Sequence, residues 1–100
     1  MLRHVVLFAY HNSTTPDEIA ALCAAFTELP QAIPGIAGFE WGADVSPEGL
    51  QRGFTHCFLL TFASSAERDA YLVHPAHLAF VETARPHLAQ SLVVDYWASR

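Results

Sequence analysis

Several side chains able to carry protons lie close together in the second half of the chain. The 100 residues include six histidines, and His74 and His77 enclose the dipeptide Pro75-Ala76. Tyr71 precedes His74 by three residues. Imidazole changes its charge near neutral pH, so it can both accept and release protons. A tyrosine hydroxyl beside two imidazoles therefore predicts acid–base chemistry on a small organic ligand.

The position of His77 relative to Pro75 favours the role of a general base. The residue before a proline avoids the α conformation, so we expect His74 to be extended and Pro75 to begin a helix. His77 then lies in the first turn, where backbone N–H groups lack partners and the helix dipole disfavours imidazolium. Burial disfavours it too. We therefore expect a neutral His77 beside N–H groups that could bind an oxyanion.

His4 and His56 lie on strand faces whose other members are apolar. An imidazole that faces a core must find a hydrogen-bond partner or line a cavity. We expect His4, His56 and His74 to be ligand-binding residues. Two alternatives stay open: His56 as a hydrogen-bonded core histidine, and His74 as a helix cap. His4 and His56 begin neighbouring antiparallel strands from opposite ends, so one ligand atom is not expected to meet both.

Metal and cofactor signatures are weak in this sequence. His74 and His77 could in principle share a zinc ion, but Glu82 is the only nearby carboxylate and a third ligand is missing. The chain has no glycine-rich phosphate loop, no Ser/His/Asp set and no nucleophilic cysteine context. We therefore expect neither a metal nor a cofactor.

The composition bounds the class of protein. One hundred residues suffice for one domain, residues 1–100, and 52% of them are hydrophobic. A net charge of −5 without a Lys/Arg cluster disfavours nucleic acid and anionic membranes as partners. No targeting segment is visible. We expect Cys23 and Cys57 to be free thiols in the cytoplasm, although a single disulfide is the alternative.

Apolar periodicity predicts four strands and three helical segments. We expect strands at residues 2–10, 36–42, 54–62 and 92–97. One helix begins at a Thr15 cap and is ended by Pro30 and the Pro34-Gly35 turn, a second runs from Ser64 to about Leu72, and a third from Pro75 to about Ala89. The last two helices form one helical stretch broken in two, so the order is β-α-β-β-α-β, which predicts a ferredoxin-like α+β fold with a four-stranded antiparallel sheet.

Both faces of the predicted sheet are apolar. In the first strand Val5 and Leu7 point one way, while Val6 and Phe8 point the other. Helices cover only one face in this arrangement, and a solvated face would be polar. Two such sheets laid together would form a closed barrel, so we expect a homodimer.

Several segments match one known family in residue type and spacing. They are residues 3–8, 39–42, 44–50, 54–56, 61–62, 71–77 and 94–96. The chain resembles the dimeric α/β-barrel, or stress-responsive A/B barrel (Dabb), family over essentially its whole length. The His-Pro-Ala-His segment, at its distance from Thr55-His56, is the most specific part of the resemblance.

The resemblance implies a homodimeric barrel and, through the branch that contains plant olivetolic acid cyclase, a cofactor-free enzyme that closes a ring by aldol condensation. By motif, it implies His77 as base and Tyr71 as hydroxyl partner, with His4 and His56 lining the pocket. The apolar pocket residues depart from that branch, so the same substrate is not implied. Some relatives hold magnesium through backbone carbonyls in the region that corresponds to residues 30–36, for which no side-chain signature exists.

Three functional hypotheses follow. In the first, a cofactor-independent enzyme acts on a carbonyl compound, His77 removes a proton next to the carbonyl, and Tyr71 hydrogen-bonds the enolate oxygen. In the second, a non-catalytic homodimer binds a small ligand or has a structural role in stress. The third is an oxygen-consuming relative of the antibiotic-biosynthesis monooxygenases, against which the His-Pro-Ala-His segment counts.

Overall fold

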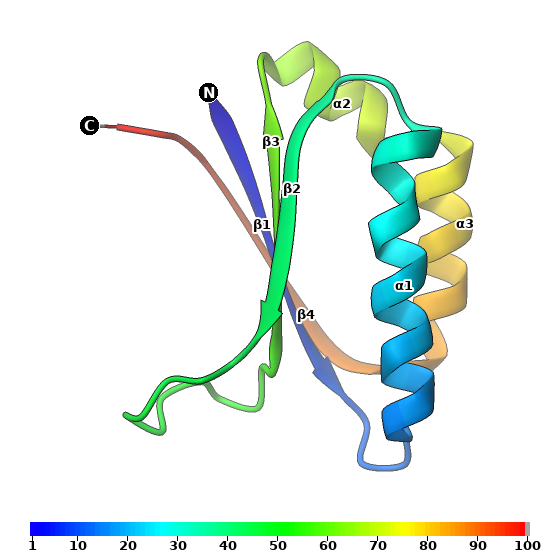
Figure 1. The fold of residues 1–100 in the computed structure, drawn as a ribbon, viewed down its shortest axis with the longest axis vertical. Coiled ribbons are helices and arrows are strands. Elements are labelled where there is room, and N and C mark those ends of the chain that lie inside the picture. Colours follow the sequence, from blue (N-terminus) through cyan, green and yellow to red (C-terminus); the bar gives the residue numbers. More distant parts are fainter. Residues whose placement is uncertain (100) are drawn as a thin grey trace.

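The computed structural model describes residues 1–99 and consists of one antiparallel sheet with helices on one side (Figure 1). The elements are β1 (Leu2–Tyr10), α1 (Pro16–Ala32), β2 (Ile36–Ala43), β3 (His56–Phe62), α2 (Ser65–Leu72), α3 (Pro75–Ala84), the 3-10 turn η1 (Arg85–His87) and β4 (Leu88–Trp97). The strand order is β2-β3-β1-β4, and all neighbours are antiparallel. The predicted ferredoxin-like α+β fold is confirmed.

Helix α1 begins where the sequence predicts and ends later. Thr15 Oγ1 accepts a hydrogen bond from the Glu18 amide at 3.2 Å, and the Glu18 carboxylate accepts one from the Thr15 amide at 2.9 Å. This reciprocal pair satisfies two amides that the helix itself cannot. Pro30 does not end the helix, because α1 continues through it to Ala32 and stops just before the Pro34-Gly35 turn, the other predicted end. A proline so close to the helix end removes few hydrogen bonds, and the chain becomes extended only at Ile33.

The third helix ends five residues before the predicted boundary near Ala89. Helix α3 stops at Ala84, the chain makes the turn η1, and β4 begins at Leu88. Pro86 lies in η1, where it lacks the N–H that a continuing α-helix would need. Strand β4 is therefore longer at its start than predicted, which brings residues 88–91 beside β1.

The helix-facing side of the sheet forms the core. Phe58, Leu60 and Phe62 of β3 are completely buried. The ring of Phe26 from α1 stacks on Phe58 with centroids 4.3 Å apart. Helices α1 and α3 lie side by side over this face (Figure 1). Aromatic packing thus fixes the helix layer above the central strands.

The other side of the sheet is left uncovered by helices, as Figure 1 shows. Three alternate residues of β4, Leu92, Val94 and Tyr96, are between 44% and 52% exposed there. Leu92 and Val94 pair in register with Leu7 and Val5 of β1. The apolar second face predicted from the strand pattern is therefore present.

The cysteines and the helix lengths test two further expectations. Cys23 is buried in α1 and Cys57 is partly buried in β3, and both are free thiols, as predicted. Among residues 1–99, no helix has both the length and the apolar character needed to cross a bilayer.

The cap of α1 generates a prediction about stability. Thr15→Ala removes the side-chain acceptor of the Glu18 amide, and we expect it to lower the free energy of unfolding by about 1 kcal/mol. Urea denaturation measures this change. Thr27→Ala is the matched control, because Thr27 only donates back to the Cys23 carbonyl within the exposed face of α1. An equal loss in both variants would argue against the cap.

Candidate functional site

A cavity of about 570 Å³ lies between the helix layer and the edge strand β4. Strand β4 crosses the sheet obliquely and leaves the helix layer as it proceeds (Figure 1). Val93 faces the helices, since it pairs with the buried Val6, yet it remains 52% exposed. No helix therefore packs tightly onto β4, and the space beneath α3 stays open. Its volume lies in the range of small-molecule sites.

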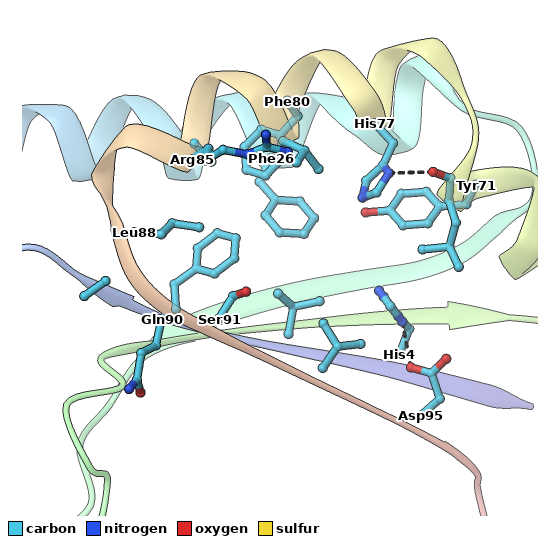
Figure 2. Close-up of a pocket in the computed structure, with 17 residues that line it drawn as sticks. His4, Phe26, Tyr71, His77, Phe80, Arg85, Leu88, Gln90, Ser91 and Asp95 are labelled. Carbon is cyan, nitrogen blue, oxygen red and sulfur yellow. Dashed lines mark hydrogen bonds and ion pairs between the residues drawn. The ribbon is translucent and has the colours of Figure 1, made fainter.

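The two ends of the cavity differ in chemistry (Figure 2). His4, Tyr71, His77 and Asp95 gather at one end, whereas Arg85, Gln90 and Ser91 lie at the other. The wall between them is mostly apolar and contains Phe8, Phe26, Phe80 and Val93. A ligand in this cavity would place a polar group among the imidazoles and an apolar body against the phenylalanines.

His77 lies in the first turn of α3, and its ring points into the polar end of the cavity (Figure 2). Its Nδ1 lies 3.0 Å from the carbonyl oxygen of Leu72. A carbonyl can only accept, so Nδ1 carries the proton, and in the neutral ring Nε2 keeps a free lone pair. Burial lowers the pKa of His77, the bond to Leu72 partly offsets this, and the neighbouring His4 ring lowers it further. His77 is therefore neutral at pH 7 and able to accept a proton at Nε2.

Tyr71 lies at the end of α2 and is only 1% exposed. Its ring centroid is 4.5 Å from that of His77 and 5.8 Å from that of His4. Burial raises the pKa of the Tyr71 phenol far above its ordinary value. The hydroxyl keeps its proton at neutral pH and can donate a hydrogen bond.

His4 is buried on β1 and bonded to a carboxylate. Its Nδ1 lies 2.7 Å from Asp95 Oδ1, and the two residues are register partners on β1 and β4. Burial raises the pKa of Asp95, but hydrogen bonds from Arg68 and His4 outweigh this, so the pKa lies below its usual range. The carboxylate is charged and accepts the proton of His4 Nδ1. In the neutral ring, Nε2 is then an acceptor.

Two of the expected ligand-binding histidines do not line this cavity. His74 caps α3, where its Nδ1 accepts a hydrogen bond from the Ala76 amide at 3.0 Å. His56 lies toward the other end of the same sheet face, against the rings of Tyr10 and Trp41 at centroid distances of 5.4 and 6.0 Å. The structure thus brings together His4, Tyr71 and His77, and separates His56 and His74 from them.

Sequence reasoning missed the partners of His4. Asp95 is a single carboxylate in an otherwise mostly apolar strand, which is a usable signal for a buried role. Arg68 bonds Asp95 across 27 residues of sequence, and no local pattern announces that contact. Among residues 1–99, no three His, Cys, Asp or Glu side chains cluster as metal ligands do.

The chain is a ferredoxin-like α+β protein in which His4, Tyr71 and His77 line a cavity beneath the third helix. The sequence profile of the stress responsive A/B barrel domain (Dabb) matches residues 2–98. The stress-response A/B barrel domain-containing protein HS1 of Arabidopsis thaliana is 36% identical over 95% of this chain and 87% of its own length. The chain belongs to the stress-responsive A/B barrel (Dabb) family, as its motifs predicted.

Relatives with enzyme names and solved structures are similar as well. Olivetolic acid cyclase of Cannabis sativa is 26% identical over 95% of this chain and 94% of its own. The structure of a hydroxynitrile lyase from Passiflora edulis superimposes with a TM-score of 0.88 at 28% identity, covering 95% of this chain and 90% of that one. A protein from Thermobifida fusca, described as dimeric and ferredoxin-like, has a TM-score of 0.80 at 30% identity, covering 95% and 88%.

The lowered pKa of His77 predicts a pH effect with a defined sign. Because the folded state holds His77 neutral below the ordinary value of 6.5, the unfolded chain binds more protons as the pH falls through that value. Stability should therefore decrease on acidification from pH 7 to pH 5, and part of that decrease should be absent in His77→Gln. Urea denaturation of both proteins at several pH values measures the difference. Identical pH profiles would contradict a neutral, half-buried imidazole.

Proposed function

We propose that this protein is a cofactor-independent enzyme that uses acid–base chemistry on a small carbonyl compound. His77 is the general base and Tyr71 the hydroxyl partner. The supporting observation is the contact between a neutral imidazole, held at Nδ1 by the Leu72 carbonyl, and a neutral phenol at the polar end of a cavity. A base and an acid that both stay uncharged at pH 7 suit proton transfer at that pH.

The proposed reaction begins with His77 Nε2. It removes a proton either from the carbon next to a carbonyl group or from the hydroxyl of a cyanohydrin, and becomes imidazolium. In the cyanohydrin the C–CN bond then breaks, which leaves a carbonyl compound and a cyanide ion that can take up the proton. Tyr71 donates a hydrogen bond to the oxygen on which negative charge develops. The proton on His77 then returns to the product. His4, through Nε2, orients the ligand without taking part in the transfer.

The apolar wall suits an aromatic or alkyl body on the substrate. The rings of Phe8, Phe26 and Phe80 pack against one another, with centroid distances between 4.7 and 6.4 Å. The names of two relatives, olivetolic acid cyclase and hydroxynitrile lyase, support a proton-transfer enzyme. The alternative is a non-catalytic, stress-related protein that binds a ligand or has a structural role, as the name of the Arabidopsis relative suggests.

We infer also that the protein is a homodimer in the cytoplasm. The uncovered sheet face carries Leu92, Val94 and Tyr96, which are too apolar and too exposed for a solvated surface. Solved relatives described as dimeric support a second copy as the partner on this face. The free thiols Cys23 and Cys57 fit a reducing compartment.

The base role predicts the effect of His77→Ala. We expect wild-type protein to exchange the α-protons of 4-phenyl-2-butanone in D₂O or to cleave mandelonitrile, followed by NMR and by benzaldehyde absorbance. His77→Ala should slow the catalysed reaction by about 100-fold or more, since general bases typically contribute that much. His11→Gln, at an exposed histidine outside the cavity, is the matched control.

Two outcomes would count against the proposal. Full activity of His77→Ala would exclude the base. Binding of either probe to wild-type protein, seen by saturation-transfer NMR but without exchange or cleavage, would favour the non-catalytic alternative.

The dimer hypothesis predicts the effect of a charge on the uncovered face. Val94→Asp places a carboxylate among apolar side chains that a partner would bury, and we expect monomers at micromolar concentration. Size-exclusion chromatography with light scattering measures the mass. Leu78→Asp changes a similarly exposed residue on α3, in the helix layer, and should leave the dimer intact. A monomeric wild-type protein would overturn the hypothesis.

A further inference from the structure

A chain of three side chains connects α2 to the polar end of the cavity. Arg68 Nη1 lies 2.7 Å from Asp95 Oδ2, and Asp95 Oδ1 lies 2.7 Å from His4 Nδ1. Each carboxylate oxygen therefore has its own partner. The same guanidinium also donates from Nε to Asp69 Oδ1 at 2.9 Å. Short contacts to a charged carboxylate are among the stronger protein hydrogen bonds.

The chain joins α2 to the paired strands β4 and β1. Arg68 belongs to α2, Asp95 to β4 and His4 to β1. Strand β4 is an edge strand that moves away from the helix layer, and the cavity occupies the space between them. The ion pair of Arg68 with Asp95 spans this separation at the polar end. It ties the helix layer to the strand that carries the partner of His4.

The three side chains differ in their exposure to solvent, and this difference indicates why Asp95 needs a second partner. The His4 side chain is 5% exposed, whereas those of Asp95 and Arg68 are 24% and 23% exposed. A carboxylate on an edge strand with water beside it has other rotamers available, and fixing one costs conformational entropy. The guanidinium binds the second oxygen, so Asp95 keeps its first oxygen on His4. The positive charge also balances the carboxylate beside a buried ring.

We propose that Arg68 is a positioning residue, which fixes Asp95 so that Asp95 holds His4 by Nδ1–H and His4 Nε2 faces the cavity as an acceptor. Figure 2 shows the ring of His4 directed from the sheet toward Tyr71 and His77. The ligand group that suits this acceptor is a hydroxyl or enol O–H. The preferred substrates of the proposed enzyme would thus be carbonyl compounds that also carry a hydroxyl. This preference for hydroxyl-bearing substrates rests on the proposed function, whereas the positioning of His4 does not.

The test of positioning uses the folded protein without ligand. In ¹⁵N-labelled wild-type protein, the His4 ring should show the Nδ1–H tautomer, with a hydrogen-bonded proton that exchanges slowly with water. Arg68→Met keeps the aliphatic stem and removes the guanidinium, and we expect that proton to exchange about tenfold faster. Arg68→Lys retains the charge and one donor and should restore most of the protection. Asp69→Asn, which alters only the other partner of Arg68, should match wild type.

A ligand pair tests the consequence for binding. Wild-type protein should bind 4-hydroxy-4-phenyl-2-butanone more tightly than 4-phenyl-2-butanone, and Arg68→Met should reduce this preference by about fivefold, the equivalent of one hydrogen bond. Equal preference in wild type and Arg68→Met would overturn the inferred substrate feature.

The outcomes separate this inference from the proposed function. An unchanged His4 tautomer and exchange rate in a folded Arg68→Met would overturn the positioning role, even if turnover by His77 were established. A faster exchange in Arg68→Met, with rescue in Arg68→Lys, would support it even if no turnover were found. Should Arg68→Met fail to fold, Arg68→Gln supplies the same comparison, and protection equal to wild type there would equally overturn the role.

Discussion

The junction between α2 and α3 is the constraint on which the site depends. Helix α2 ends at Leu72 and α3 begins at Pro75, so two helix termini meet within a few residues. The last carbonyls of a helix have no partner within it. The carbonyl of Leu72 is satisfied by the ring of His77, which comes from the first turn of the next helix. One unpaired backbone group thus selects the tautomer of the imidazole and leaves its other nitrogen free.

Burial prepares both members of the proposed acid–base pair. Removal from water disfavours the charged form of any titratable group, so it lowers the pKa of His77 and raises that of Tyr71. The two rings are therefore neutral together at pH 7, as a base and an acid must be before they exchange protons with a ligand. The charged groups of the site, Arg68 and Asp95, lie behind His4 and compensate each other. The neutral rings of Tyr71 and His77 thus face the cavity, and the ion pair of Arg68 with Asp95 lies on the other side of His4.

The start of a helix could be predicted from the sequence, because residues next to one another determine it. The start of α3 at Pro75 follows from the proline itself, and the same rule placed His77 in the first turn. The ends of helices were harder to predict, because Pro30 near the end of α1 costs little, whereas Pro86 coincides with the turn into β4. A proline marks a boundary only where the surrounding packing does not hold the helix.

The features of the site that the sequence could not predict depend on contacts between residues far apart in the chain. The sequence predicts that His4 and His56 begin neighbouring strands from opposite ends. The register agrees, because His56 pairs with Phe8 and His4 pairs with Leu60, at a distance along the same two strands. The pairing of Arg68 with Asp95 joins residues 27 positions apart in the sequence, and no periodicity encodes it.

Strand β4 couples the cavity to the surface where we infer the partner subunit. Successive side chains of a strand point to opposite faces, so Ser91, Val93 and Asp95 line the cavity, while Leu92 and Val94 face the uncovered side. Strand β4 pairs with β1 alone, and a shift of β4 along β1 would move Asp95 away from His4. A second copy packed on Leu92 and Val94 would restrain the strand from the side opposite the helices. Dimer formation and the geometry of the imidazoles therefore depend on the same backbone.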